Sequence, residues 1–188
     1  INIRFKKRKF DKIINDIKNI KIQGARNIAR SALEAYFLIP TESSKKILLD
    51  SRPTEPMLWN VLKKADNQNY KAILNHFKET QEKINKHVFK LIKNKDVIFT
   101  HCHSTNVIDS LIYAKKNGKK FEIYNTETRP LYQGRKTARE LKNAGIKVTM
   151  FVDSALAVAI EKENKKDKIY AKKVFLGADA LLKTGIVN

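Results

Sequence analysis

The spacing of hydrophobic residues changes near residue 95 and predicts two kinds of structure. Before this point, apolar residues recur at helical spacing, which predicts helices over 10–20, from Gly24 to Pro40, and over 42–49, 55–64 and 68–93. After it, short apolar runs predict strands over 97–100, 121–125, 147–152 and 173–176, with helices over 105–117, 133–144 and 154–163. Strands that alternate with helices are typical of a parallel sheet with helices on both faces.

We therefore expect an α/β protein with two domains. Residues 1–94 form a helical N-terminal domain, and residues 95–188 form a Rossmann-like doubly wound parallel sheet. Four strands without a closing helix are fewer than such a sheet usually has, so we expect a C-terminally truncated, incomplete α/β domain. In the helical half, Thr54 is a candidate N-cap for helix 55–64. The long helix over 68–93 should turn Leu91 inward and leave His76 and His87 structural or exposed.

The composition narrows the class of protein. One cysteine among 188 residues excludes an intramolecular disulfide framework and is typical of a reducing cytoplasm. No apolar run approaches the ~20 residues that span a bilayer, and no signal peptide opens the chain, so we expect no membrane association. The net charge is +20, but its lysines are scattered and do not form a stripe, so nucleic acid is not the expected partner. Local positive charge suits an anionic metabolite better.

Polar and reactive side chains follow the predicted strands. Because the carboxyl ends of parallel strands meet at one edge of a sheet, these groups should converge if the strands are parallel. They are also explained as helix caps and turns, most simply for Ser104 and Ser154, which occupy N-cap positions. The groups concerned are Cys102, Ser104, Arg129, Asp153, Ser154 and Asp179.

The triplet His101-Cys102-His103 allows three kinds of chemistry. Alternation along a strand puts the two histidines on one face and Cys102 on the other, which argues against a metal chelate. A nucleophilic Cys–His pair needs a substrate with a leaving group. In the third interpretation, Cys102 and Asp179 face each other as an acid–base pair that moves a proton between adjacent carbons of a sugar phosphate. Cys102 could equally be a small buried hydrophobe.

Three stretches are candidate anion sites. Arg129 follows a strand end and is stiffened by Pro130, while Gln133 and Gly134 open a helix whose first N–H groups can bind phosphate. Arg135 and Lys136 lie in the first turn of that helix, where cations are unfavourable unless an anion is near. Gly24 either exposes free N–H groups or makes a plain helix–helix turn. Arg52, held on the stiff segment before Pro53, is either functional or an exposed loop residue.

Several motifs occur in an order that resembles a known family. They are Thr100-His101-Cys102-His103-Ser104, Thr126-Glu127-Thr128-Arg129-Pro130 with Gln133-Gly134, Val152-Asp153-Ser154-Ala155, and Gly177-Ala178-Asp179 with Asn188. Over about residues 20–188 the sequence is similar to the family that joins the α, β and δ subunits of translation initiation factor 2B with two sugar-phosphate isomerases. These enzymes are ribose 1,5-bisphosphate isomerase and methylthioribose-1-phosphate isomerase.

The resemblance implies an archaeal aldose–ketose isomerase that converts ribose 1,5-bisphosphate to ribulose 1,5-bisphosphate in nucleotide (AMP) degradation. The catalytic cysteine and aspartate of the family fall on Cys102 and Asp179, act through an enolate-type intermediate, and need no metal or other cofactor. The resemblance also implies a homo-oligomer, either a dimer or a hexamer. Its substrate-binding positions fall on Gln23, Gly24, Ala25, Arg52, Ser104, Arg129, Gln133, Gly134 and Asn188.

A second interpretation stays open at this point. The chain could be a non-catalytic regulatory subunit similar to those of translation initiation factor 2B, which binds a sugar phosphate or a nucleotide and contacts initiation factor 2. The family enzymes typically carry arginine where this chain has Gln23. Turnover separates the two interpretations, because only the isomerase predicts it.

Overall fold

The computed structural model describes residues 2–161 and 170–187. Its internal contacts divide the chain into two compact units. One consists of Ile1–Glu79 with Ala178–Asn188, and the other consists of Thr80–Gly177. We call them the helical unit and the α/β unit and describe each by itself. The predicted boundary between two domains near residue 94 stays a prediction.

The helical unit is built from helices whose apolar stripes meet in one core. Ile17, Leu33 and Leu48 are fully buried there, as the helical spacing of apolar residues predicts. A short antiparallel hairpin of β5 and β6 belongs to the same unit. The elements are α1 Ile3–Lys18, α2 Ala25–Leu38, α3 Glu42–Ser51, α4 Pro56–Lys64, the first part of α5 Tyr70–Leu91, β5 Ala180–Leu182 and β6 Gly185–Val187.

The start of α4 differs from the sequence prediction. Thr54 does not cap this helix. Glu55 is the N-cap, and its carboxylate accepts a hydrogen bond from the Met57 backbone N–H at 3.3 Å. Pro56 occupies the first helical position, where a missing N–H costs nothing. The cap therefore moves to the residue directly before that proline.

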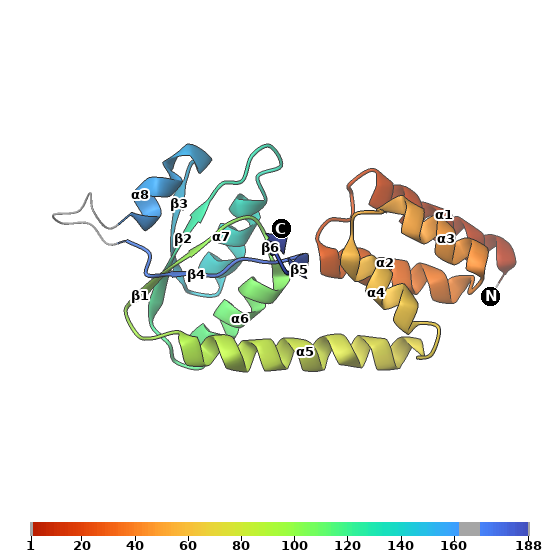
Figure 1. Ribbon diagram of the computed structural model, residues 1–188, viewed down its shortest axis with the longest axis horizontal. Coiled ribbons are helices and arrows are strands. Elements are labelled where there is room, and N and C mark those ends of the chain that lie inside the picture. Colours follow the sequence, from red (N-terminus) through yellow and green to blue (C-terminus); the bar gives the residue numbers. More distant parts are fainter. Residues whose placement is uncertain (1, 162–169, 188) are drawn as a thin grey trace. The chain divides into compact units, whose positions relative to one another are not determined.

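The α/β unit contains a four-stranded, fully parallel sheet, as predicted, and its strand order is β3-β2-β1-β4 (Figure 1). Its strands are β1 Asp96–Thr100, β2 Phe121–Thr126, β3 Lys147–Phe151 and β4 Lys173–Val174. Its helices are the end of α5, α6 Thr105–Lys116, α7 Gln133–Asn143, the 3₁₀ turn η1 Asp153–Ala155 and α8 Leu156–Ile160. Lys173 on β4 forms an ion pair with the buried Asp96 on β1.

Side chains alternate between the two faces of this sheet. Ile98 and Ile123 pack in one cluster with residues of α5, α6 and α7. Val97 and Phe99 pack in a second cluster that includes Ala159 of α8. Helices therefore cover both faces, which is the doubly wound arrangement that the sequence predicts.

The strand order places a reversal beside β1. The chain moves from β1 to β2 and β3 on one side, and then returns to place β4 on the other side. In sheets of this type ligands bind beyond the carboxyl ends of the strands where the order reverses. The carboxyl end of β1 leads directly into His101-Cys102-His103.

Three element predictions need correction. Leu91 is 56% exposed, because α5 ends there and the fully buried Ile92 takes the core position. The helix expected over 154–163 begins as η1, and α8 ends at Ile160, while residues 162 and 163 lie outside the described part. The strand expected over 173–176 is limited to Lys173–Val174.

His76 and His87 are exposed on α5, as expected. Within residues 2–161 and 170–187, none of the helices has the length and apolar character needed to cross a membrane.

Candidate active site

Cys102 sits in a strained corner after β1. Its φ angle is 61°, in the left-handed region that residues with a side chain seldom occupy. The Cys102 N–H donates to the Thr128 hydroxyl at 3.0 Å, and the Thr137 hydroxyl donates to the Cys102 carbonyl at 2.7 Å. Such backbone strain persists only where surrounding contacts fix it, and it concentrates at functional sites. The thiol is therefore held on a rigid turn, and the side chain is partly buried.

The two histidines beside Cys102 contact different partners. His101 Nδ1 lies 2.5 Å from the Thr126 hydroxyl at the end of β2, whereas His103 Nε2 lies 3.2 Å from a Glu140 carboxylate oxygen on α7. Because β1 ends at Thr100 and Cys102 has a left-handed backbone, the alternation expected of a strand does not extend over this triplet.

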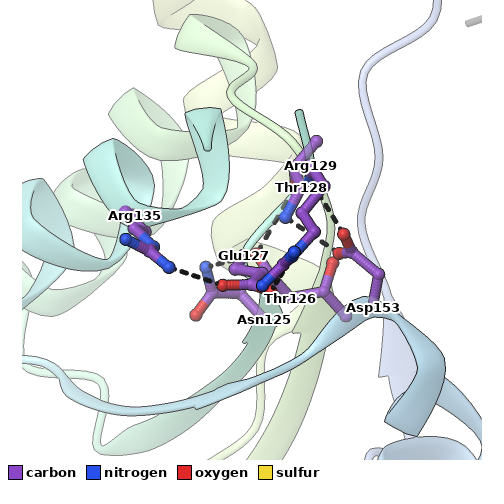
Figure 2. A network of polar contacts seen from close by, with 7 residues as sticks. All are labelled: Asn125, Thr126, Glu127, Thr128, Arg129, Arg135 and Asp153. Carbon is purple, nitrogen blue, oxygen red and sulfur yellow. Dashed lines mark hydrogen bonds and ion pairs between the residues drawn. The ribbon is translucent and has the colours of Figure 1, made fainter. Parts of the chain in front are cut away.

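Asp153 organises the loop that follows β2. Its two carboxylate oxygens accept hydrogen bonds from the backbone N–H groups of Thr128 and Arg129, both at 2.8 Å (Figure 2). These bonds, that from Arg129 foremost, hold the pKa of the Asp153 carboxyl below its usual value. Asp153 thereby joins the end of β3 to the end of β2.

Glu127 pairs with two arginines of the predicted anion site. Its carboxylate lies 2.8 Å from Arg129 Nε and 2.8 Å from an Arg135 guanidinium nitrogen (Figure 2). The hydrogen bond from Arg129, followed by that from Arg135, holds the Glu127 pKa below its usual value. The same contact raises the pKa of Arg129. The anion expected near the first turn of α7 is thus supplied, at least in part, by the chain itself.

The ring of Tyr132 completes this cluster. Tyr132 is the N-cap of α7 and has a left-handed backbone. The guanidinium carbon of Arg135 lies 3.9 Å from the ring centroid, and that of Arg129 lies 5.5 Å from it. Cation–π contacts and the carboxylate together fix the two arginines in place. The Arg129 side chain remains 64% exposed and so can still meet a ligand.

Gly134 permits a close approach of α7 to β2. A Cβ atom at this position would lie 1.8 Å from the Thr126 carbonyl oxygen. The Asn125 side-chain amide spans the same contact by donating to the Gly134 carbonyl at 2.8 Å. The Asn125 Oδ1 atom is buried and has no hydrogen-bond partner among the described residues. Gly134 is therefore required by packing, whatever else its N–H group does.

Ser104 and Gln133 occupy the positions that the sequence predicts for them. Ser104 is the N-cap of α6, but its side chain makes no capping hydrogen bond. Gln133 is the first residue of α7. With Cys102, Arg129 and Gly134, both residues lie at the carboxyl edge of the sheet in the α/β unit.

The other predicted site residues belong to the helical unit. Gly24, with φ 82°, is the N-cap of α2, and Ala25 is the first residue of that helix. The Gln23 side-chain amide donates to the Ile20 carbonyl at 2.8 Å, so this group is engaged within its own turn. Arg52 is partly buried, and Asp179 is exposed at the start of the β5–β6 hairpin. Asn188 lies outside the described residues.

Glu55 is a further carboxyl near two of these residues. Burial raises its pKa, as does the negative charge of Asp179, while the Met57 N–H and Arg52 oppose that rise. Arg52, Glu55 and Asp179 therefore interact electrostatically within the helical unit. Cys102 and Asp179 belong to different units, and their pairing stays a prediction.

Sequence reasoning did not assign a role to the acidic partners of this site. Glu127 and Asp153 lie within recognised motifs, but their task is to hold Arg129, Arg135 and the loop backbone. The sequence does carry a signal for these ion pairs, because Arg129 and Arg135 follow Glu127 by two and eight residues. The opposite charges became partners only through the fold, because α7 turns back on the end of β2.

The sequence matches the profile of the Initiation factor 2 subunit family over residues 21–188. The chain belongs to this family. Curated relatives named ribose 1,5-bisphosphate isomerase are 35% identical in Thermococcus kodakarensis, with 93% of this chain and 62% of the relative covered, and 33% identical in Methanocaldococcus jannaschii, with 92% and 62% covered. The chain thus spans somewhat less than two thirds of the length of these family members.

Other relatives of this chain carry a different name. A relative from Pyrococcus furiosus, named as a translation initiation factor eIF-2B subunit 2-like protein, is 30% identical, with 94% of this chain and 68% of the relative covered. Among solved structures, the Pyrococcus horikoshii translation initiation factor eIF-2B superposes with a TM-score of 0.74 at 22% identity, covering 94% of this chain and 68% of that one. This likeness supports the family fold.

Proposed function

We propose that this protein is a sugar-phosphate aldose–ketose isomerase, most specifically one that converts ribose 1,5-bisphosphate to ribulose 1,5-bisphosphate. The observation that carries the proposal is the Cys102 corner. The single cysteine of the chain lies at the carboxyl end of β1, beside the reversal of strand order, with both of its peptide groups fixed by hydrogen bonds. Relatives named for this isomerase support the substrate.

The reaction moves two hydrogens and leaves the composition of the substrate unchanged. The hydrogen on C2 transfers to C1, and the proton of the O2 hydroxyl leaves as O2 becomes the ketone oxygen. The bond between C1 and the ring oxygen breaks, and the ring oxygen becomes a hydroxyl. We assign the transfer from C2 to C1 to Cys102 and Asp179 as a thiol–carboxylate pair, passing through an enolate-type intermediate.

The proposed phosphate contacts are described for each unit by itself. Arg129 offers an exposed guanidinium, and the N-terminus of α7 at Gln133 and Gly134 offers backbone N–H groups. In the helical unit, Gln23, Gly24 and Ala25 at the start of α2, together with Arg52, are the proposed contacts, and Ser104 and Asn188 complete the set. Because Glu127 already neutralises part of the arginine charge, it sets how strongly Arg129 can attract an anion.

The first experiment follows ribose 1,5-bisphosphate by NMR with the protein at its natural length. Turnover is expected in the wild type and should fall by at least ~100-fold in Cys102→Ser and Asp179→Asn, because each variant removes one proton-transfer group. His87→Gln changes an exposed histidine of α5 and serves as a control that should keep the wild-type rate. Wild-type rates in either site variant would refute the assigned pair.

A regulatory subunit is the second candidate, favoured by the relative named as eIF-2B subunit 2-like. In that case the same carboxyl edge would bind a sugar phosphate or a nucleotide without turnover, and the protein would associate with initiation factor 2. Absence of turnover together with co-purification of initiation factor 2 would replace the isomerase proposal. Homo-oligomer formation is compatible with both candidates, and analytical ultracentrifugation would distinguish a dimer from a hexamer.

A further inference from the structure

We infer that the exposed face of α1 binds a single-stranded nucleic acid, through its phosphates and one stacked base. This binding is independent of the isomerase function proposed above. Lysine is scattered along the chain as a whole, but cations are dense at the start of α1. Six of the ten residues from 3 to 12 are lysine or arginine and one is acidic, against 39 lysines and arginines among all 188 residues.

The first turns of α1 precede the part of the helix that packs in the core of the helical unit. Phe10 is the first buried side chain of this helix, at 4% exposed, whereas Phe5 is 58% exposed. Arg4, Arg8 and Lys12 are all exposed. Because residues four apart lie on the same face of a helix, these three cations form one row with steps of about 6 Å along the axis. Such a row can follow a chain of phosphates.

The cations nearest the start of α1 have no carboxylate partners. Further along the helix, Lys9 pairs with Glu34 and Lys12 pairs with Asp16, both at 2.5 Å. Within residues 2–161 and 170–187, no ion pair is formed by Arg4, Lys6, Lys7 and Arg8. At the start of α7 the chain itself supplies the anion, as Glu127, but α1 has no acidic residue in its first turn. Like charges one turn apart repel, so an external polyanion would stabilise this face.

An unpaired nucleic-acid strand fits this surface better than a membrane does. Arg8 and Lys9 are the neighbours of the exposed Phe5 one turn on. Proteins that bind single strands combine cations along the backbone with aromatic rings on which bases stack. A helix that lies on a membrane needs a free apolar face, but the apolar stripe of α1, with Ile14 and Ile17, is buried in the core.

The charged face is tested by fluorescence anisotropy with a labelled oligouridylate of about 15 nucleotides and the protein at its natural length. The triple variant Arg4→Gln/Lys7→Gln/Arg8→Gln should bind at least ~10-fold more weakly than the wild type. The slope of log affinity against log salt should also decrease in magnitude by about 2, because each phosphate contact to a single strand contributes about 0.7. An unchanged affinity and slope would overturn the inference.

A matched triple variant separates this face from the net charge of +20. Lys46→Gln/Lys63→Gln/Lys71→Gln removes the same charge from exposed positions on α3, α4 and α5, and its affinity should stay within ~2-fold of the wild type. Equal losses in the two triple variants would assign the binding to overall charge and overturn the inference. Circular dichroism should show wild-type helix content in both, because glutamine is a good helix former and all six positions are exposed.

The stacked base is tested separately at Phe5. Phe5→Leu keeps an apolar side chain and removes the ring, so binding should weaken about 5-fold while the salt slope stays unchanged. Wild-type affinity in Phe5→Leu, or equally tight binding of a duplex of the same length, would refute the stacking of a base.

Other polyanions are compared under the same conditions, at about 0.15 M salt. Vesicles of phosphatidylserine and phosphatidylcholine, and polyglutamate, should each bind at least ~10-fold more weakly than oligouridylate, because neither offers a base to the Phe5 ring. Tighter binding of either probe, lost in the Arg4→Gln/Lys7→Gln/Arg8→Gln variant, would assign this face to a membrane or to an acidic protein instead.

Discussion

The two units bury different kinds of side chain. The core of the helical unit is apolar, and among its described residues the buried polar side chains are Ser44, Ser51 and Glu55, at or near the ends of α3 and α4. The α/β unit also has apolar clusters, but it buries a row of polar groups along the carboxyl edge of its sheet. These include Thr100, Asn125, Thr126, Glu127, Thr128 and Thr137. Burying polar groups is costly unless each is bonded, so their concentration at one edge marks where the fold serves chemistry.

The contact between α7 and β2 leaves no room for a side chain at Gly134, and breaking it should have the largest effect. Gly134→Ala places a Cβ 1.8 Å from the Thr126 carbonyl oxygen, so α7 must shift and lose the bond from Asn125. We expect a loss of about 4 kcal/mol or more in unfolding free energy, measured by urea denaturation. Gly118→Ala, where nothing lies within 4 Å but φ is +87°, should cost only about 1 kcal/mol. Equal losses would show that α7 can adjust.

A cavity in the helical unit should have the next largest effect. Leu33 is fully buried in the core of that unit, so Leu33→Ala should lower the unfolding free energy by about 3 kcal/mol. Ile47→Ala truncates a side chain that is 41% exposed and is the matched control, with an expected loss below about 1 kcal/mol. A small loss in Leu33→Ala would mean that the helices close the cavity, in contrast to the rigid edge of the sheet.

Lowering the pH should weaken the contacts that Glu127 and Asp153 make at the carboxyl edge of the sheet. Glu127 and Asp153 have pKa values lowered in the fold from ordinary values of 4.5 and 3.8. Their stabilising contribution is present above those values and is lost as the pH falls through the lower, folded-state pKa. Glu127→Gln removes one of these groups, so its stability should decline less steeply than that of the wild type below about pH 4.5. The exposed Glu82→Gln should keep the wild-type slope, and identical slopes in all three proteins would contradict the pairing with the two arginines.

The smallest effect is expected at the surface of the helical unit. Trp59 is 50% exposed, and its indole Nε1 donates to the Pro53 carbonyl at 3.1 Å. Trp59→Phe keeps most of the apolar contact and removes this bond, so the loss should be about 0.5–1 kcal/mol. Thermal unfolding is sufficient to measure it. A loss as large as that of Leu33→Ala would show that this loop is part of the core.

The elements of the fold could be predicted because hydrophobic spacing is a local property of the sequence. The parallel strands follow from apolar runs separated by amphipathic helices, and the Cys102 corner lies where the run of β1 ends. The left-handed backbone at Cys102 could not be predicted, because cysteine does not favour it and long-range hydrogen bonds with Thr128 and Thr137 hold it there. The partners of His101 and His103, on either side of Cys102, are likewise long-range contacts.

The charged partners of the site could not be predicted for a similar reason. Arg135 in the first turn of α7 correctly indicated a nearby anion, but the sequence could not distinguish an internal carboxylate from a ligand. The pairing with Glu127 depends on how closely α7 approaches β2, which a glycine at 134 allows. Long-range contacts of this kind are set by packing, which spacing along the chain does not encode.

The left-handed corner has a consequence for how this chain could evolve. Glycine adopts φ 61° without the penalty of about 1–2 kcal/mol that a side chain incurs there. Random substitution under selection for stability alone would therefore drift toward glycine at residue 102. The thiol at this position means that stability and chemistry make opposite demands on residue 102. If the Cys102→Gly protein is inactive and more stable than the wild type, the difference in unfolding free energy measures how much the thiol destabilises the fold.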